Sequence, residues 1–266
     1  MKWSGGKTRL LGELSARLPA QWNRYFEPFA GGAALFFRLA PARAVLGDLN
    51  ADLITTYRAI IDDLDGVSRE LRRHRAAHDH EHYYATRARW NAERTSWRPA
   101  KRAATFIYLN KTCFNGLWRV NRAGAFNVPI GRYTDPPIYV PDALRAAREL
   151  LARTELHAGD YRTTLREAGA GDLVYLDPPY HPLSETASFT SYTAGAFGPR
   201  DQEILARTAR ALVARGCHVV LSNSDTEFVR GLYRGFQIER VRCSRSINSI
   251  GERRGEIDEL IISGSG

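Results

Sequence analysis

Short apolar segments alternate with segments of helical periodicity along most of this chain, and this alternation limits the possible folds more than any other feature of the sequence. Strand-like segments, rich in apolar and aromatic residues, occur at 24–29, 43–48, 155–158, 172–177, 217–222, 236–242 and 256–262. Helical segments are predicted at 33–39, 51–64, 142–152 and 199–215. Strands that alternate with helices are typical of a parallel sheet. The sequence therefore predicts an α/β fold with a seven-stranded sheet.

The alternation is interrupted between about residues 66 and 140. Up to residue 111 this stretch has no convincing strand, and its Arg, Ala, His, Tyr and Trp residues occur at helical spacing. Residues 113–133 then read CFNGLWRVNRAGAFNVPIGRY, where Asn-Gly and Ala-Gly separate short aromatic runs. Turn-forming dipeptides at this spacing favour a hairpin or a looped ribbon. We therefore expect a helical insert with a hairpin inside the α/β domain.

The positive charge of the chain is concentrated in this insert. The whole chain has 38 Lys and Arg against 29 Asp and Glu, a formal net charge of +9. Residues 69–133 contain 14 of the basic residues and only four acids, which makes this window +10 and the remainder nearly neutral. A concentrated basic region indicates a polyanionic partner, most simply nucleic acid. Charge alone leaves open a solvated, arginine-rich helical face.

Composition excludes several other classes of protein. No apolar run approaches the ~20 residues that a membrane span requires. The first residues, MKWSGGKTRL, lack the apolar stretch of a secretory signal. The three cysteines form no CxxC pair, so we expect neither a disulfide framework nor a cysteine-rich zinc site. These features fit a cytoplasmic protein.

Four histidines are clustered at 74, 78, 80 and 82. His74 and His78 share a helix face, but no HExxH motif is present and no cysteine or acid completes a metal site. We therefore interpret the cluster as part of a solvated helix and expect no metal.

The tetrapeptide Asp177-Pro178-Pro179-Tyr180 follows the apolar segment LVYL directly. Ligands of open parallel sheets bind beyond the carboxyl ends of strands, so we expect the motif to lie at the ligand-binding edge of the sheet. Pro179 lacks an N–H and fixes the turn. The Asp177 carboxylate and the Pro178 carbonyl can then accept both hydrogens of an exocyclic amine, while Tyr180 stacks on the base. The alternative is a plain proline-rich turn.

A Gly-Gly turn at Gly31 and Gly32 lies between a strand-like and a helical segment, in FEPFAGGAALFF. Such a turn allows a ligand to approach the backbone closely. Asp48 ends the next strand, where an acid commonly accepts hydrogen bonds from ribose hydroxyls. This arrangement is typical of an adenosine cofactor site, although the dinucleotide fingerprint GxGxxG is absent. An ordinary βα turn with a helix-capping acid is the alternative.

The N-terminal segment KWSGGKT ends like a phosphate-binding loop, but no strand can precede it. Trp3 and Lys7 could instead present an aromatic face and an amine to a cationic ligand that carries a carboxylate. The alternative is a capped terminus.

The 113–133 segment and the preceding Lys111 combine cations, amides and aromatic rings without any acid. Arg and Asn side chains can read base edges, and aromatic rings can wedge or stack between bases. The residues are Lys111, Phe114, Asn115, Trp118, Arg119, Asn121, Arg122, Phe126, Asn127, Arg132 and Tyr133. The alternative is a basic surface hairpin with a small aromatic core.

Seven motifs follow one another along the chain: KWSGGKTRLL, FEPFAGGAALFF, GDLNADLI, YLNKTCFNGLWRVN with GAFNVPIGRY, VYLDPPY, SFTSYT and RSINSIGERRGEIDELII. In this order they resemble the motifs of the Dam-type DNA adenine-N6 methyltransferases, the D12 class. The resemblance implies a Rossmann-like seven-stranded methyltransferase sheet with helices on both faces and its last antiparallel strand inserted as a hairpin. It also implies a catalytic domain at 1–65 and 141–266 and a basic DNA target-recognition insert at 66–140.

The resemblance further implies S-adenosylmethionine as cofactor and duplex DNA as substrate. The residues implied to bind the cofactor are Trp3, Lys7, Phe29, Gly31, Gly32, Asp48, Asp160, Tyr161 and Asp177, and those implied to contact DNA are Lys2, Phe114, Asn115, Arg119 and Arg132. Two positions depart from the family pattern. Ala33 stands where a second spaced glycine is often found, and Phe114 stands where some members have tyrosine.

The implied reaction is methyl transfer to the N6 amine of a flipped adenine, most commonly within GATC, by a monomer. Cytosine-N4 methylation uses similar chemistry but more often has serine before the two prolines. A glutamine-modifying methyltransferase would favour asparagine there and would not need the basic insert. A non-catalytic DNA-binding module is a further alternative.

Overall fold

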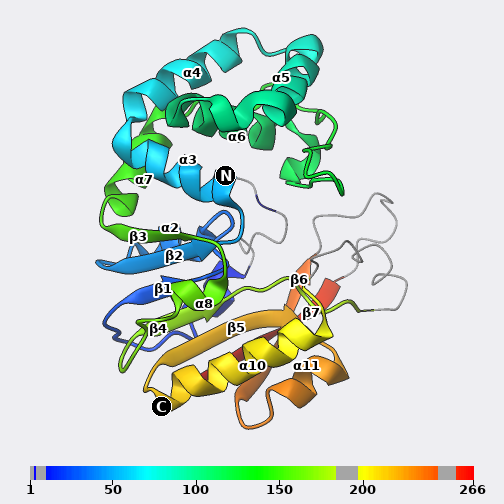
Figure 1. Ribbon diagram of the computed structural model, residues 1–266. Coiled ribbons are helices and arrows are strands. Elements are labelled where there is room, and N and C mark those ends of the chain that lie inside the picture. Colours follow the sequence, from blue (N-terminus) through cyan, green and yellow to red (C-terminus); the bar gives the residue numbers. More distant parts are fainter. Residues whose placement is uncertain (1–2, 4–9, 184–196, 245–255) are drawn as a thin grey trace. The chain divides into compact units, whose positions relative to one another are not determined.

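The computed structural model describes residue 3 and residues 10–183, 197–244 and 256–266 of the 266-residue chain. The described residues form two compact units, which Figure 1 shows in sequence colours. The first unit draws on residues 1–6, 31–33 and 47–160, and the second on residues 7–30, 34–46 and 161–266. The predicted insert at 66–140 lies within the first unit. The SFTSYT motif and most of RSINSIGERRGE lie outside the described residues.

Seven strands form one mixed sheet with the order β3-β2-β1-β4-β5-β7-β6. The strands are β1 (Tyr25–Glu27), β2 (Ala44–Asp48), β3 (Thr154–Ala158), β4 (Leu173–Leu176), β5 (His218–Ser224), β6 (Gln237–Ser244) and β7 (Glu256–Ser265). β2 and β4 both pair with β1 in parallel, and β5 pairs with β4 in parallel. β7 is antiparallel to both β5 and β6. The prediction of a Rossmann-like seven-stranded sheet is confirmed, with its last strand inserted between β5 and β6.

The core of the second unit lies where α10 (Pro199–Ala214) packs on the sheet. Leu205, Ala209 and Leu212 of this helix form one buried cluster with Val219 and Leu221 of β5. Central parallel strands are buried on both faces and therefore read as continuous apolar runs, as LVYL of β4 does. The other helices among the described residues of this unit are α1 (Leu11–Ser15), α2 (Ala34–Leu39), α8 (Tyr161–Thr164) and α11 (Glu227–Leu232).

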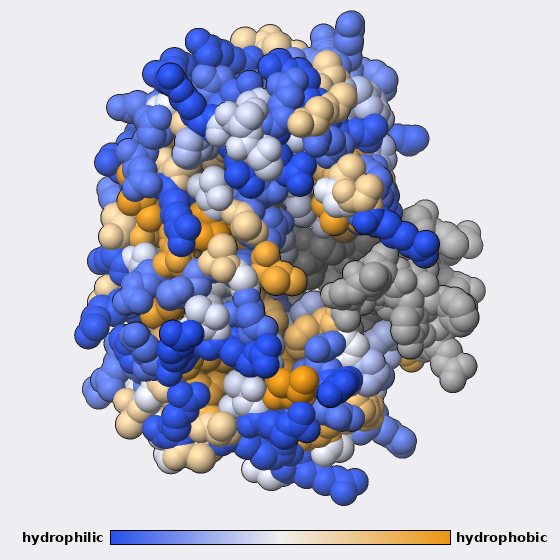
Figure 2. Space-filling view, viewed as in Figure 1, coloured by the Kyte–Doolittle hydropathy of each residue, from blue (hydrophilic) through white to orange (hydrophobic). Residues whose placement is uncertain are grey.

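The first unit is mainly helical. Its helices are α3 (Ala51–Asp62), α4 (Leu64–Ala76), α5 (His80–Glu93), η1 (Arg94–Ser96), α6 (Pro99–Thr112), η2 (Phe114–Gly116) and α7 (Pro141–Leu151). The described residues from 66 to 111 contain no strand, as the sequence predicts. Most residues of α6 are buried, among them Phe106, Tyr108 and Leu109. Hydrophilic residues cover most of the visible face of α4 and α5 (Figure 2).

The single helix expected at 51–64 ends earlier than predicted. α3 ends at Asp62 and α4 begins at Leu64, because Asp63 leaves the helical conformation and accepts a hydrogen bond of 2.8 Å from the backbone N–H of Gly66. Asp63 therefore acts as the N-cap of α4. No helix within the described part of the chain is long and apolar enough to cross a membrane.

Residues 113–133 form a looped ribbon without a named strand. Two isolated antiparallel bridges join Cys113 to Ile130 and Val120 to Phe126. Side chains of α5 replace part of the missing ladder, because Asn91 bonds both the N–H and the C=O of Phe126. The backbone C=O of Val128 accepts hydrogen bonds from Tyr83 and Arg87, also of α5. Buried backbone groups are thus paired without a regular hairpin.

The interpretation of the histidine cluster as a solvated helix is wrong for His74. Its ring stacks on that of Tyr108 at 4.4 Å and 6°. Its nitrogens lie 3.0 Å from Nε2 of His82 and 3.2 Å from Oγ1 of Thr105. Burial lowers the pKa of His74 to about 3, with a further contribution from His82. The cluster packs α4 and α5 onto α6, and among the described residues no group of three potential ligands is placed to hold a metal.

Candidate active site

The register between β4 and β5 places polar residues from the two strand ends side by side. Leu176 of β4 pairs with Leu221 of β5, so the residues that follow, Asp177 and Ser222, are neighbours. The Ser222 hydroxyl donates a hydrogen bond of 3.0 Å to Oδ1 of Asp177. Tyr175, two residues before Asp177, shares its face of the strand. The Tyr175 hydroxyl lies 3.0 Å from Ser222 Oγ, so two buried hydroxyl groups support the carboxylate.

The ring of Tyr180 is fixed by a hydrogen bond at its hydroxyl. This hydroxyl donates to Oε2 of Glu259, in β7, at 2.8 Å. The pKa of Tyr180 lies well above its ordinary value, because burial and then the negative charge of Asp177 disfavour the phenolate. Tyr180 is therefore neutral at physiological pH.

The backbone of the Pro-Pro turn is held by side chains from α10 and β5. Gln202 donates a hydrogen bond of 2.8 Å to the carbonyl of Pro179, and Asn223 donates one of 3.1 Å to Oε1 of Gln202. Oδ1 of Asn223 accepts the N–H of His181 at 3.1 Å. Gln202 and Asn223 are buried, whereas Pro179 is exposed. Two buried amides thus fix the path of the chain through the motif.

Three aromatic rings form a second feature of this unit. Phe29, which follows β1, stacks on Tyr161 at 5.1 Å between ring centroids and meets Phe197 edge-on at 5.9 Å. Asp160, an exposed residue, directly precedes Tyr161. Aromatic rings held in this way can contact a planar nucleobase.

In the first unit, the glycine turn, Trp3 and Asp48 come together. Gly31 has a φ of +48°, and a Cβ there would lie 2.5 Å from Cδ1 of Trp3. The position therefore requires glycine. The backbone N–H groups of Gly31 and Asn50 each donate a hydrogen bond of 2.8 Å to the Asp48 carboxylate. Burial raises the pKa of Asp48, although both of these hydrogen bonds lower it.

Ala33 adopts a φ of +50° and is buried. A non-glycine residue in the left-handed region costs about 1–2 kcal/mol. The conformation at this position is thus one that favours glycine, and alanine adopts it at an energetic cost.

The ribbon at 113–133 exposes some of the predicted DNA-contacting residues and packs the rings of Trp118 and Phe126 against each other. Phe114 is 43% exposed, and Asn115 follows it in the left-handed region at a φ of +54°. Arg119 is exposed and donates a hydrogen bond of 2.9 Å to Asn127. Arg132 is exposed as well.

The ring of Trp118 packs between those of Phe106 and Phe126, at 3.9 Å and 4.5 Å. Phe126 is 1% exposed. Trp118 and Phe126 therefore form the small aromatic core that the sequence left as an alternative, and they are not free to stack on bases.

The structure thus brings the sequence-predicted residues together in separate groups within each unit. Trp3, Gly31 and Asp48 are joined in the first unit, and Asp177 and Tyr180 share one network in the second. Lys2 and Lys7 lie outside the described residues.

Sequence reasoning missed the residues that support the motif: Tyr175, Gln202, Ser222, Asn223 and Glu259. The polar run Ser222-Asn223-Ser224 at the end of an apolar strand was the available signal.

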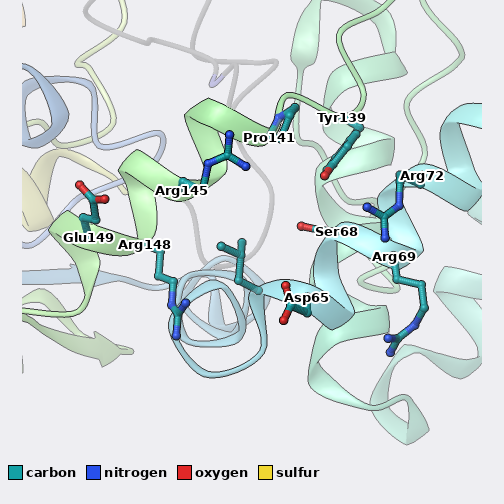
Figure 3. Close-up of a pocket in the computed structure, with 10 residues that line it drawn as sticks. Asp65, Ser68, Arg69, Arg72, Tyr139, Pro141, Arg145, Arg148 and Glu149 are labelled. Carbon is teal, nitrogen blue, oxygen red and sulfur yellow. The ribbon is translucent and has the colours of Figure 1, made fainter.

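A cavity of about 550 Å³ lies between α4 and α7 in the first unit, and its lining contains none of the predicted site residues. Figure 3 shows the side chains of Arg72 and Tyr139 next to each other in this lining, with the guanidinium 5.6 Å from the ring centroid. Four arginines line the cavity together with Asp65 and Glu149. The basic surface of this unit is therefore not confined to the ribbon.

Comparison with known proteins identifies the family. The model of the D12 class N6 adenine-specific DNA methyltransferases matches residues 3–247. The chain belongs to this family. The chain is 38% identical to a Type II methyltransferase of Lactococcus lactis subsp. cremoris, over 100% of its own length and 94% of that protein. It is 39% identical to a Type II methyltransferase of Methanocaldococcus jannaschii, over 98% and 97% of the two chains.

A DNA adenine methylase of Escherichia coli (strain K12) is 37% identical to this chain, over 98% of the chain and 93% of the relative. The protein is therefore an adenine-specific DNA methyltransferase, and DNA is its substrate.

Proposed function

We propose that this enzyme transfers a methyl group from S-adenosylmethionine to the N6 amine of an adenine rotated out of duplex DNA. The observation that carries the proposal is the carboxylate of Asp177, bound by Ser222 directly after a central strand and adjacent in sequence to the Pro-Pro-Tyr turn. Its charge, its hydrogen-bonded support and the neighbouring ring of Tyr180 suit a flat base that carries an amine.

Adenine N6 is a poor nucleophile because its lone pair is delocalised into the ring. We propose that Asp177 and the Pro178 carbonyl accept the two N–H groups of this amine and so favour a tetrahedral nitrogen with an available lone pair. Tyr180 stacks on the base. Taking the base out of the duplex costs roughly a few kcal/mol, which these contacts offset.

The carboxylate of Asp177 also stabilises the positive charge that develops on the amine during attack. The methylated ammonium is acidic and loses its proton after transfer, so the proposal needs no separate strong base. Holding both reactants in line accounts for much of the remaining acceleration.

The residues of the first unit fit the proposed cofactor, which when bound supplies an electrophilic methyl group on a sulfonium. Two backbone N–H groups orient the Asp48 carboxylate. Each oxygen of an ionised carboxylate has a further acceptor position, which suits ribose hydroxyls. We propose that Trp3, Lys7, Gly31, Gly32 and Asp48 bind the cofactor with Phe29, Asp160, Tyr161 and Asp177.

We propose that residues 66–140 form the target-recognition insert and that GATC is the recognised sequence. The exposed side chains of Phe114, Asn115, Arg119 and Arg132, together with Lys2, are the proposed DNA contacts. A single chain carries all of these groups, so we propose that the enzyme acts as a monomer. Incubation with plasmid followed by methylation-aware sequencing tests the site, and methylation of a different sequence would overturn GATC.

The role of Asp177 is tested by substitution with asparagine, which keeps its shape but removes its charge. Loss of an electrostatic contact of this kind costs about 100-fold or more in turnover. We expect such a loss in the transfer of a radiolabelled methyl group, and complete loss for Asp177→Ala, with duplex DNA binding retained. Glu203→Gln, an exposed carboxylate on α10, is the matched control. Wild-type turnover by Asp177→Ala would overturn the assignment.

A further inference from the structure

We infer that Ser222 and Tyr175 are positioning residues for the methyl transfer, acting through the carboxylate of Asp177. The inference rests on the proposed function of Asp177 and goes beyond it, because neither residue belongs to the Asp-Pro-Pro-Tyr motif. The structure joins them in one chain of hydrogen bonds, from the Tyr175 hydroxyl to Ser222 Oγ at 3.0 Å and from Ser222 Oγ to Asp177 Oδ1 at 3.0 Å.

The direction of this chain follows from its chemistry. An ionised carboxylate only accepts hydrogen bonds, so the single hydroxyl hydrogen of Ser222 points to Asp177. Ser222 Oγ is then left as an acceptor, and the Tyr175 hydroxyl must be the donor to it. Burial and then the charge of Asp177 raise the pKa of Tyr175 well above its ordinary value, so Tyr175 keeps the proton that it donates.

Burial makes the chain rigid. Ser222 is 0% exposed and Tyr175 is 1% exposed, and both lie on neighbouring central strands whose register is fixed by backbone pairing. A hydroxyl held in this way fixes the rotation of the carboxylate, which aligns its oxygens with an amine. Charge-assisted hydrogen bonds are also stronger than those between neutral groups, which favours one orientation.

Removal of the Ser222 hydroxyl leaves the carboxylate of Asp177 in place but takes away this buried donor to Oδ1. Supporting residues of this kind change the rate of the chemical step more than the binding of either reactant. We therefore expect Ser222→Ala to lower the single-turnover rate constant by about 10- to 100-fold. The affinity for S-adenosylmethionine, measured by calorimetry, and the KM for duplex DNA should stay close to wild type.

Tyr175→Phe is the second test variant, because it removes only the hydroxyl that donates to Ser222. We expect a smaller loss than for Ser222→Ala, and no additional loss when both substitutions are combined, since Tyr175 acts only through Ser222. Ser222→Thr keeps a hydroxyl and should recover part of the rate. Tyr233→Phe also removes a hydroxyl from a fully buried tyrosine in the same unit and serves as the control that leaves the rate unchanged.

The outcomes separate this inference from the proposal on which it rests. If Asp177→Ala is inactive but Ser222→Ala and Tyr175→Phe keep the wild-type single-turnover rate, the positioning role is wrong and the role of Asp177 stands. If Asp177→Ala is fully active, the proposed function of Asp177 fails first. Additive losses in the double variant would also overturn the inference, because they would mean that Tyr175 does not act through Ser222. Should Ser222→Ala fail to fold, Tyr175→Phe and Ser222→Thr decide the question.

Discussion

The half-buried His74 should make the helical unit sensitive to mild acid. Its pKa is lowered from 6.5 to about 3, chiefly by burial and then by the charges of His82, Lys101 and Arg89. Between these two values the unfolded chain binds a proton that the native chain does not. The contribution of neutral His74 to the free energy of unfolding is therefore fully present above about pH 6.5 and is lost as the pH decreases toward 3.

The size of the effect follows from the difference between the ordinary pKa of histidine, 6.5, and the pH of the measurement. At pH 5.0 this difference is about 1.5 units, and each unit corresponds to about 1.4 kcal/mol. His74 alone should then lower the free energy of unfolding by about 2 kcal/mol between pH 7.5 and 5.0. Protonation would also place a cation against the ring of Tyr108 and the nitrogen of His82, within the packed contact of α4, α5 and α6.

Denaturant unfolding at the two pH values measures this difference. Four of the five tryptophans belong to the first unit, so tryptophan fluorescence reports mainly on its unfolding. In His74→Gln the difference between pH 7.5 and 5.0 should shrink by about 2 kcal/mol, whatever the substitution does to stability at pH 7.5. His80→Gln, at an exposed position of α5, should leave the difference unchanged. An equal pH dependence in wild type and His74→Gln would refute the reasoning.

Two further predictions concern cofactor and DNA binding. In Gly31→Ala the new Cβ would lie 2.5 Å from Trp3, which is about 1 Å inside a normal contact. The affinity for S-adenosylmethionine should therefore fall about tenfold, or by about 1.4 kcal/mol. Gly235→Ala is the control, because Gly235 has a φ of +93° but no atom within 4 Å of the new Cβ, so this variant should keep its affinity. Arg132→Ala should cost roughly 1–3 kcal/mol of DNA binding and relax the site preference if it reads a base. Arg72→Ala, in the α4–α7 cavity, should change neither the DNA affinity nor the site preference. If Arg132→Ala leaves the site preference unchanged, Arg132 contacts only a phosphate.

Most of the sheet could be predicted because its strands are buried on both faces. LVYL at 173–176 and CHVVLS at 217–222 are apolar runs that no exposed element would carry, and the ends of the observed strands lie within three residues of the predicted ones. The start of α10 was also predictable, since Pro199 occupies its first turn ahead of an apolar stripe.

The insert was harder to predict because its contacts are distant in sequence. His74 is polar and lies among arginines, which indicates a solvated face, yet its partners Thr105 and Tyr108 come from a helix about 30 residues further on. The ribbon likewise depends on Asn91, which takes the backbone hydrogen bonds of Phe126. Tertiary partners of this kind override the local pattern.

The candidate site was likewise predictable only in part. Asp177 and Tyr180 were predicted from the motif alone, because a charged residue and two prolines after an apolar strand stand out in the sequence. The supporting residues were not found, since nothing in either strand by itself shows which residue will lie beside Asp177. That information is contained in the pairing of β4 with β5.

The register of this pairing is set by the core and not by the site. A slip of one residue between β4 and β5 would place Asn223 beside Asp177 and would turn Ser222 to the opposite face. The same slip would move the side chains of Val219 and Leu221 out of the cluster that they form with α10. Burial of these apolar residues therefore selects one register, and the hydrogen bond from Ser222 to Asp177 follows from it. A substitution that repacks β5 should accordingly disturb the orientation of the Asp177 carboxylate even when no residue of the motif is changed.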